Sequence, residues 1–204
     1  MKLSLASKSA LALACLALAA APAQAVDIAS STGGNQTAFG GYRPGQSFTV
    51  VGSGSYTNIT FNFFSDAGTT PFASGTGFLL STAYSGNVAG LSSGTAGYLG
   101  QATASGGLYD FGGSATLIAG TQYFFYSTGL LSSFGDITGS GSNLYSGGVL
   151  YSDGGGNTNY GVSSGDWNFR VNGTATGVPD AGSTALLLAL GVAGLWFGRR
   201  ARQA

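Results

Sequence analysis

The chain of 204 residues contains no histidine and no glutamate, and its single cysteine, Cys15, lies near the N-terminus. Its only lysines are Lys2 and Lys8. The segment 26–177 therefore cannot build a Ser–His–Asp or Cys–His catalytic group, a zinc site of the usual kind, or a disulfide. Paired aspartates could still act as acid and base, as in glycoside hydrolysis. Nearly all of them, however, lie beside Gly, Ser or Thr, where Asp normally caps turns. We predict that the protein is not an enzyme.

Charge is also scarce in this segment, which has six aspartates against two arginines and a net charge of about −4. A basic surface for nucleic acid is absent. Phe, Tyr, Val and Ile are abundant, so the segment should fold, and its length suits one domain. Asp166 and Arg170 are expected to form a surface ion pair worth at most about 1 kcal/mol.

The N-terminus has the pattern of a secretory signal peptide. Lys2 and Lys8 precede the apolar run Ala10–Ala21, and Ala23-Gln24-Ala25 follows as a small-x-small cleavage site. The predicted signal peptide is 1–25, with a signal helix at its centre, and cleavage leaves Val26 as the first mature residue.

The C-terminus has the pattern of a membrane anchor. Residues 181–198 carry no charge and as a helix span roughly 27 Å, close to the thickness of a bilayer core. Arg199, Arg200 and Arg202 follow, and such clusters remain on the cytoplasmic side. We predict one transmembrane helix, with everything before Val178 outside the inner membrane.

The motif before that helix is Val178, Pro179, Asp180, Ala181 and Gly182. Together with the apolar helix and the terminal arginines, it resembles the PEP-CTERM class of bacterial sorting signals, and more closely its VPDSG variant. Ala181 departs from the serine usual in that variant, and Asp180 from the glutamate of the commonest form. The resemblance implies recognition by an exosortase-type membrane transpeptidase that cuts near the motif.

Between the two ends, short apolar segments alternate with Gly/Ser/Asn/Asp clusters, which is typical of an all-β fold. The clearest is Tyr56–Phe64, where Ile59, Phe61 and Phe63 share one face. Residues 26–45 are expected to form a leader loop or a short edge strand. We predict an antiparallel, jelly-roll-like β-sandwich over 26–177, followed by the sorting signal at 178–204.

Four short segments of this region resemble the choice-of-anchor exported domains. They are Gln46–Thr49, Phe78–Ser81, Leu117–Tyr123 and Gly165–Val171. The resemblance implies a β-sandwich and assigns no activity.

Two ligand hypotheses arise from residues 145–167. Asp153, Asn157 and Asn159 offer oxygen ligands for a structural calcium ion, although a bare loop is the simpler interpretation. Alternatively, exposed aromatics among Tyr145, Tyr151, Tyr160 and Trp167 could stack on a sugar beside Asp153, Asn157 and Asp166. Against this, Trp167 and Phe169 lie on one expected strand, where core packing is favoured.

The sequence as a whole predicts an exported protein with a non-catalytic β-sandwich. Its expected partners are an exosortase-type enzyme, the inner membrane and possible exopolysaccharide, and its expected location is the cell surface or extracellular matrix. Two alternatives stay open: a carbohydrate-binding surface module, and a single-pass protein that is never cut.

Overall fold

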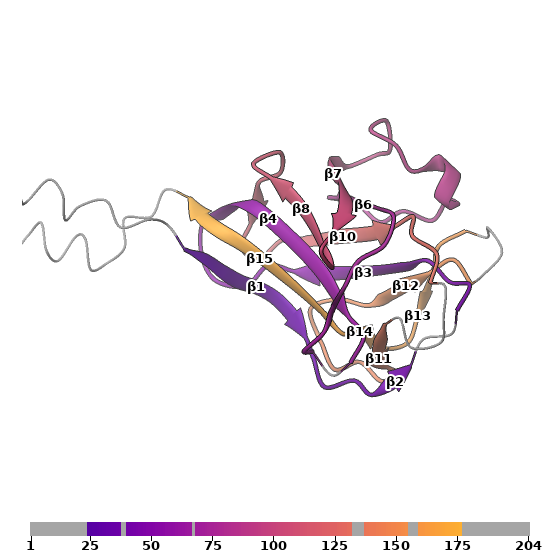
Figure 1. The fold of residues 1–204 in the computed structure, drawn as a ribbon. Helices are drawn as coiled ribbons and strands as arrows, with labels where there is room; N and C mark the ends of the chain where they lie inside the picture. Colours follow the sequence, from indigo (N-terminus) through magenta and orange to yellow (C-terminus); the bar gives the residue numbers. More distant parts are fainter. Residues whose placement is uncertain (1–23, 38–39, 67, 132–136, 155–158, 177–204) are drawn as a thin grey trace, which may run out of the picture. The chain divides into compact units, whose positions relative to one another are not determined.

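The computed structural model describes residues 24–37, 40–66, 68–131, 137–154 and 159–176, and these fold as antiparallel β structure (Figure 1). The first strands are β1 (Ala25–Ser31), β2 (Gln36–Thr37), β3 (Pro44–Thr49), β4 (Ser55–Phe64), β5 (Pro71–Phe72), β6 (Thr76–Leu80), β7 (Tyr98–Ser105) and β8 (Leu108–Gly112). The others are β9 (Leu117–Ile118), β10 (Gln122–Ser127), β11 (Thr138–Ser140), β12 (Leu150–Ser152), β13 (Gly161–Ser163), β14 (Asp166–Trp167) and β15 (Phe169–Thr176). This confirms the predicted all-β, antiparallel class.

The one helix in the described ranges is a 3-10 turn, η1 (Val88–Gly90). No helix within those ranges has the length and apolar character needed to cross a membrane. The two apolar segments for which helices were predicted, 10–21 and 181–198, lie outside the described residues.

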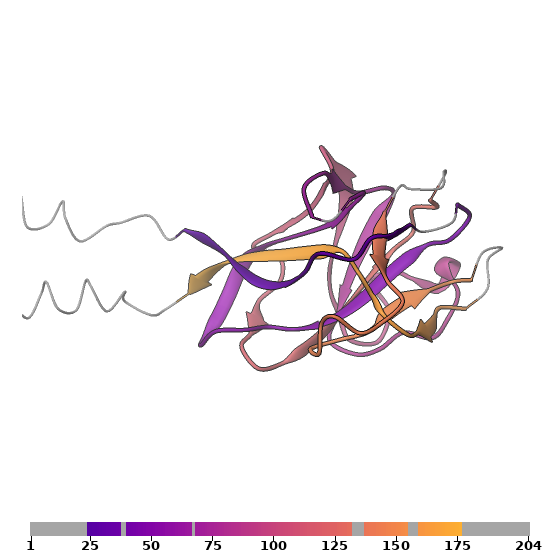
Figure 2. The same cartoon turned by 90° about the horizontal axis from the view of Figure 1, so that it is seen from below.

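The strands form one long antiparallel ladder in the order β1-β15-β4-β8-β7-β6-β10-β3-β12-β13, and a small sheet in the order β14-β11-β2. The ladder folds back on itself at the β7–β8 hairpin, so that β1, β15, β4 and β8 face β6, β10, β3 and β12 (Figures 1 and 2). The arrangement agrees with the predicted β-sandwich, while its jelly-roll-like connectivity stays a prediction.

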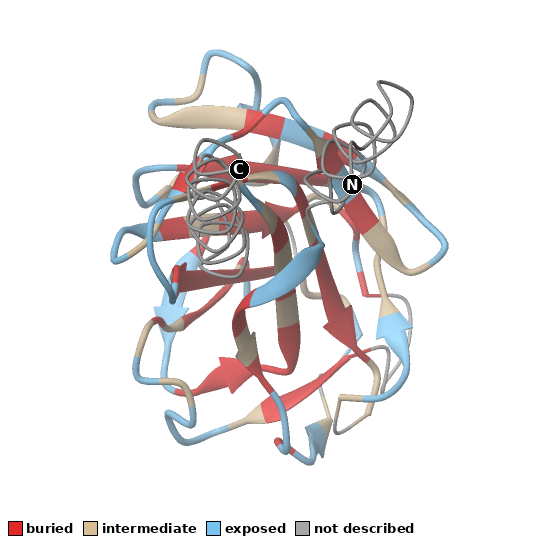
Figure 3. Ribbon diagram, turned by 90° about the vertical axis from the view of Figure 1, so that its left-hand side faces the viewer, coloured by how far each residue is buried: buried red, intermediate tan, exposed pale blue. Residues whose placement is uncertain are grey.

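Aromatic rings fill the space between the two layers. Phe61 of β4 stacks on Phe125 of β10 with ring centroids 3.8 Å apart, and Phe63 meets Phe125 edge to face at 5.6 Å. Phe169 of β15 lies parallel to Phe61 at 5.8 Å. All four side chains are 0–1% exposed. Buried residues recur along the strands of the sandwich (Figure 3). Such close packing of large rings is the main source of stability for a chain without disulfides.

The alternation of β4 is as predicted for Ile59, Phe61 and Phe63, which are all buried. The strand also contains a bulge, because the register with β8 shifts between Ile59 and Thr60. Asn58, just before that shift, has φ of 51°. Asn tolerates this left-handed region better than most residues, so it suits a bend in a strand.

The second face of β10 is also buried, which the sequence did not predict. Tyr126 is 0% exposed and belongs to a separate cluster with Leu80, Leu91, Tyr151 and Tyr160. The loop that contains η1 supplies Leu91 to this cluster. One layer of the sandwich is therefore covered on both faces.

β1 is an edge strand, in agreement with the prediction for the start of 26–45, and β15 is its neighbour. Ala25 pairs with Thr174 and Ser31 with Phe169. The first residues of β1 and the last residues of β15 therefore leave the sandwich at the same end (Figure 1).

Candidate functional site

Asp153, the central residue of the calcium hypothesis, forms a buried ion pair. Its carboxylate is 0% exposed and lies 2.5 Å from the Arg43 guanidinium, and it also accepts a hydrogen bond from the Arg43 backbone N–H at 2.9 Å. The positive charge that neutralises the Asp153 carboxylate therefore comes from the Arg43 side chain. Within the described residues, no cluster of three or more His, Cys, Asp or Glu side chains could hold a metal ion.

Of the other two residues of that hypothesis, the structure describes only Asn159. Asn159 is exposed and forms an isolated β-bridge with Asn87. Asn157 lies outside the described residues, as do the sorting motif Val178–Gly182 and the terminal arginines.

Asp166 does not pair with Arg170, which corrects the expected ion pair. The Asp166 carboxylate is buried and accepts hydrogen bonds from the Gln46 side chain at 3.0 Å and the Tyr145 backbone N–H at 2.9 Å. Arg170 instead lies 3.3 Å from Asp27 on β1. The physical reason is the strand geometry, since residues four apart along extended chain are separated by about 13 Å.

The predicted platform of exposed aromatics does not form. Tyr151 and Tyr160 are 8% and 2% exposed, and the Tyr160 hydroxyl donates to the Ser127 carbonyl oxygen at 2.6 Å. Tyr145 packs against the main core and donates its hydroxyl to the Thr49 carbonyl oxygen at 2.8 Å. Core packing, the favoured interpretation for Trp167 and Phe169, is confirmed by exposures of 8% and 0%.

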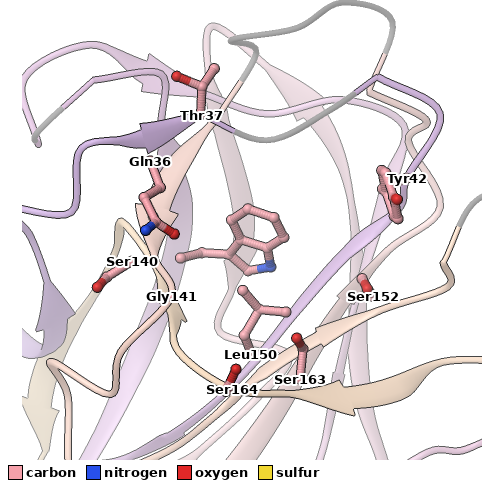
Figure 4. A pocket seen from close by; sticks show the side chains of 11 residues that line it. Gln36, Thr37, Tyr42, Ser140, Gly141, Leu150, Ser152, Ser163 and Ser164 are labelled. Carbon is pink, nitrogen blue, oxygen red and sulfur yellow. The ribbon is translucent and has the colours of Figure 1, made fainter.

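Trp167 nevertheless lies at a pocket of about 320 Å³ (Figure 4). The pocket opens between the small sheet β14-β11-β2 and the β12–β13 hairpin, and Trp167 and Leu150 form its apolar part. Its polar side chains are Gln36, Thr37, Tyr42, Ser140, Ser152, Ser163 and Ser164. Gly139 and Gly141 complete the wall. Sequence reasoning singled out Trp167, but it missed Gln36, Thr37 and Tyr42, because they lie more than a hundred residues before it in the chain.

Buried hydrogen bonds fix the apolar part of this pocket. The Trp167 backbone N–H donates to the Gln46 side-chain oxygen at 3.1 Å, and its indole N–H donates to the Tyr151 carbonyl oxygen at 3.3 Å. Gly165, just before β14, has φ of +105°, and a Cβ there would overlap the Ser140 carbonyl oxygen. Only glycine fits this close approach of the two backbones. The indole is therefore held in one position.

Two buried tyrosines of the smaller cluster, Tyr126 and Tyr160, give the protein a testable pH dependence. Burial raises the pKa of Tyr126, and burial together with the nearby Asp153 charge raises the pKa of Tyr160. An unfolded tyrosine ionises near pH 10, so above that pH the unfolded state binds fewer protons than the folded state. Stability from these groups is complete below about pH 10 and is lost as the pH rises further.

We therefore expect alkaline unfolding whose dependence on pH is steep, at about 1.4 kcal/mol per pH unit for each such tyrosine. Circular dichroism between pH 8 and pH 12 would measure it. The double variant Tyr126→Phe/Tyr160→Phe should show a shallower fall above pH 10 than the parent protein. Equal slopes in the two proteins would contradict the assignment.

Comparison with known protein families gives a match at the C-terminus of the chain. Residues 177–202 match the family model described as the VPDSG-CTERM motif. No curated protein and no solved structure shows a significant match to the chain, so the resemblance of the sandwich to choice-of-anchor domains stays a prediction. The VPDSG-CTERM motif implies an exosortase-type sorting signal and supports the conclusion that this chain is a sorting-signal protein.

Proposed function

We propose that this chain is an exported protein whose C-terminal signal delivers a non-catalytic β-sandwich to the cell surface or extracellular matrix. The observation that carries the proposal is the VPDSG-CTERM motif at 177–202. The predicted signal peptide routes the chain through the inner membrane, and the predicted apolar helix holds it there until an exosortase-type enzyme cuts near Pro179–Gly182.

The fold is compatible with processing at both ends. Cleavage after Ala25 removes the first residue of β1 and leaves Val26–Ser31 to pair with β15. β15 ends at Thr176, before the motif begins. A cut at either predicted point would therefore remove almost none of the backbone pairing that holds the sandwich together. The folded domain before and after processing should be the same.

Intact-mass analysis of envelope and culture-medium fractions tests this function. We expect a mature chain that begins at Val26 and ends between Asp180 and Gly182. Replacing Arg199, Arg200 and Arg202 with alanine should cause the unprocessed chain to accumulate or be lost from the envelope, because the positive cluster no longer fixes the cytoplasmic end of the helix.

The matched control replaces the same three arginines with lysine, which keeps the charge and should leave processing unchanged. A mature product that still contains Trp196 and the arginines would overturn processing and identify a permanent single-pass anchor. Normal mass and fractionation in the alanine variant would also count against the sorting signal.

A further inference from the structure

The pocket beside Trp167 lies at the end of the sandwich opposite the start of β1 and the end of β15. β15 begins at Phe169, two residues after Trp167, and runs the length of the front layer to Thr176, beside the start of β1 (Figure 1). Eight residues of extended chain cover about 26 Å. A domain tethered through the end of β15 would thus hold this pocket away from the point of attachment.

Among the residues that the structure describes, no charged side chain lines the pocket. The two arginines of the segment 24–176 are each paired with an aspartate, Arg43 with Asp153 and Arg170 with Asp27. The same segment has a net negative charge. An anionic ligand would therefore find no cation here and would meet an unfavourable field. The pocket suits a neutral ligand.

All of the polar side chains of the pocket except Ser140, whose hydroxyl is 3.1 Å from the Ser142 hydroxyl, are available to such a ligand. Within the described part of the chain, the side chains of Gln36, Thr37, Tyr42, Ser152, Ser163 and Ser164 form no hydrogen bond to another protein group. They include five hydroxyls, which can each donate or accept, and one amide, which can do both at once. This set is matched to a ligand that itself carries many hydroxyls.

The apolar part complements those groups. Leu150 and the fixed indole of Trp167 offer carbon surface beside the hydroxyls, as the C–H faces of a sugar ring require. A volume of about 320 Å³ is at the small end of ligand sites, which commonly measure roughly 300–1,000 Å³. A pocket of this volume suits one short unit of a longer ligand, which would enter from the solvent-exposed side of the pocket.

We propose that this pocket binds a neutral sugar unit, such as the end or a side branch of an uncharged polysaccharide. The proposal goes beyond sorting, because it depends only on the described sandwich and would stand if the C-terminus were never cut. It also replaces the platform of exposed tyrosines with a different set of residues, of which only Trp167 was predicted.

Tryptophan fluorescence tests the proposal directly. Trp167 and Trp196 are the only tryptophans, so Trp196→Phe in the full chain, purified in detergent, leaves Trp167 as the single reporter. The probes are neutral oligosaccharides of glucose, galactose, mannose or N-acetylglucosamine, with oligogalacturonate as the charged comparison. We expect a saturable change in Trp167 emission with at least one neutral probe and none with oligogalacturonate.

Two neighbouring residues of β13 supply a matched pair of variants. Ser163 lines the pocket, and Val162, which is 65% exposed, does not. Successive side chains of a strand point to opposite sides, so tyrosine at 163 should fill the pocket while tyrosine at 162 should point away. We expect Ser163→Tyr to weaken binding by more than about tenfold and Val162→Tyr to leave it unchanged.

Each outcome of the fluorescence titrations with the parent protein and the two variants either supports or overturns the proposed site. Binding of a neutral probe that Ser163→Tyr removes and Val162→Tyr retains would support the site. No response to any neutral probe, a response only to oligogalacturonate, or equal effects of the two variants would overturn it. Melting temperatures of both variants within a few degrees of the parent protein would show that the fold is intact.

Discussion

Phe125→Ala should destabilise the sandwich by about 3–5 kcal/mol, which is the usual cost of removing a fully buried aromatic side chain. Phe125 is 0% exposed and has ring contacts with Phe61, Phe63, Tyr109 and Phe111, all from strands of the facing layer. Its loss would open a cavity between the layers that rigid strands cannot collapse to fill. For a domain of this size, the melting temperature should fall by roughly 10 °C or more.

The neighbouring residue is the control for this prediction. Phe124 lies on the other face of β10, is only half-buried and has its nearest aromatic partner, Tyr151, in the smaller cluster. Phe124→Ala should therefore cost less than half as much. Thermal unfolding followed by circular dichroism, on the full chain in detergent, measures both. Equal losses would show that the inter-layer stack is not the principal core.

Arg43→Met is the second substitution with a large expected effect, and it should lower the free energy of unfolding by about 3–5 kcal/mol. The Arg43 guanidinium is 2.5 Å from the fully buried Asp153 carboxylate and also donates to the Thr128 carbonyl oxygen at 3.3 Å. Methionine keeps much of the side-chain volume but removes the positive charge that neutralises Asp153. A buried carboxylate deprived of its cation is strongly destabilising.

A double variant separates lost charge from lost packing. Asp153→Asn added to Arg43→Met removes the uncompensated charge and should restore part of the lost stability. Asp27→Asn, in the half-exposed pair with Arg170, should change stability by no more than about 1 kcal/mol. Urea unfolding gives all three values. If Asp27→Asn costs as much as Arg43→Met, burial is not what makes the Arg43–Asp153 pair important.

The β class and several strand faces were predictable because they depend on local pattern. The alternation of apolar and polar residues predicted that Ile59, Phe61 and Phe63 share one buried face of β4. This pattern can be recognised in the sequence of β4 without knowledge of the rest of the fold. The short strands β11 and β13 carry no such signal, because their Thr-Gly-Ser and Gly-Val-Ser sequences have almost no apolar pattern. They are strands only because the adjacent strands of their sheets supply their hydrogen-bond partners.

Side-chain roles near the pocket were harder to predict, because they depend on pairings across more than a hundred residues. Asp153 meets Arg43, and Asp166 meets Gln46, through contacts that span 110 and 120 positions. In the sequence both aspartates have the appearance of surface turn residues, since each stands beside glycine. Their burial follows from the positions of β3 and β12 in the sheet.

The sequence by itself showed that this protein carries a sorting motif, since the motif at 177–202 is contiguous and the order of its residues is the signal. It also determined that the segment between the two ends would be β structure without His, Cys, Lys or Glu chemistry. Only the tertiary structure decided which polar groups are satisfied internally and which remain open. It buries Asp153 and Asp166 and gathers serines of β12 and β13, with Trp167 of β14, around one neutral pocket. The reason is physical: a motif acts through neighbours in the chain, whereas a pocket is made by neighbours in space.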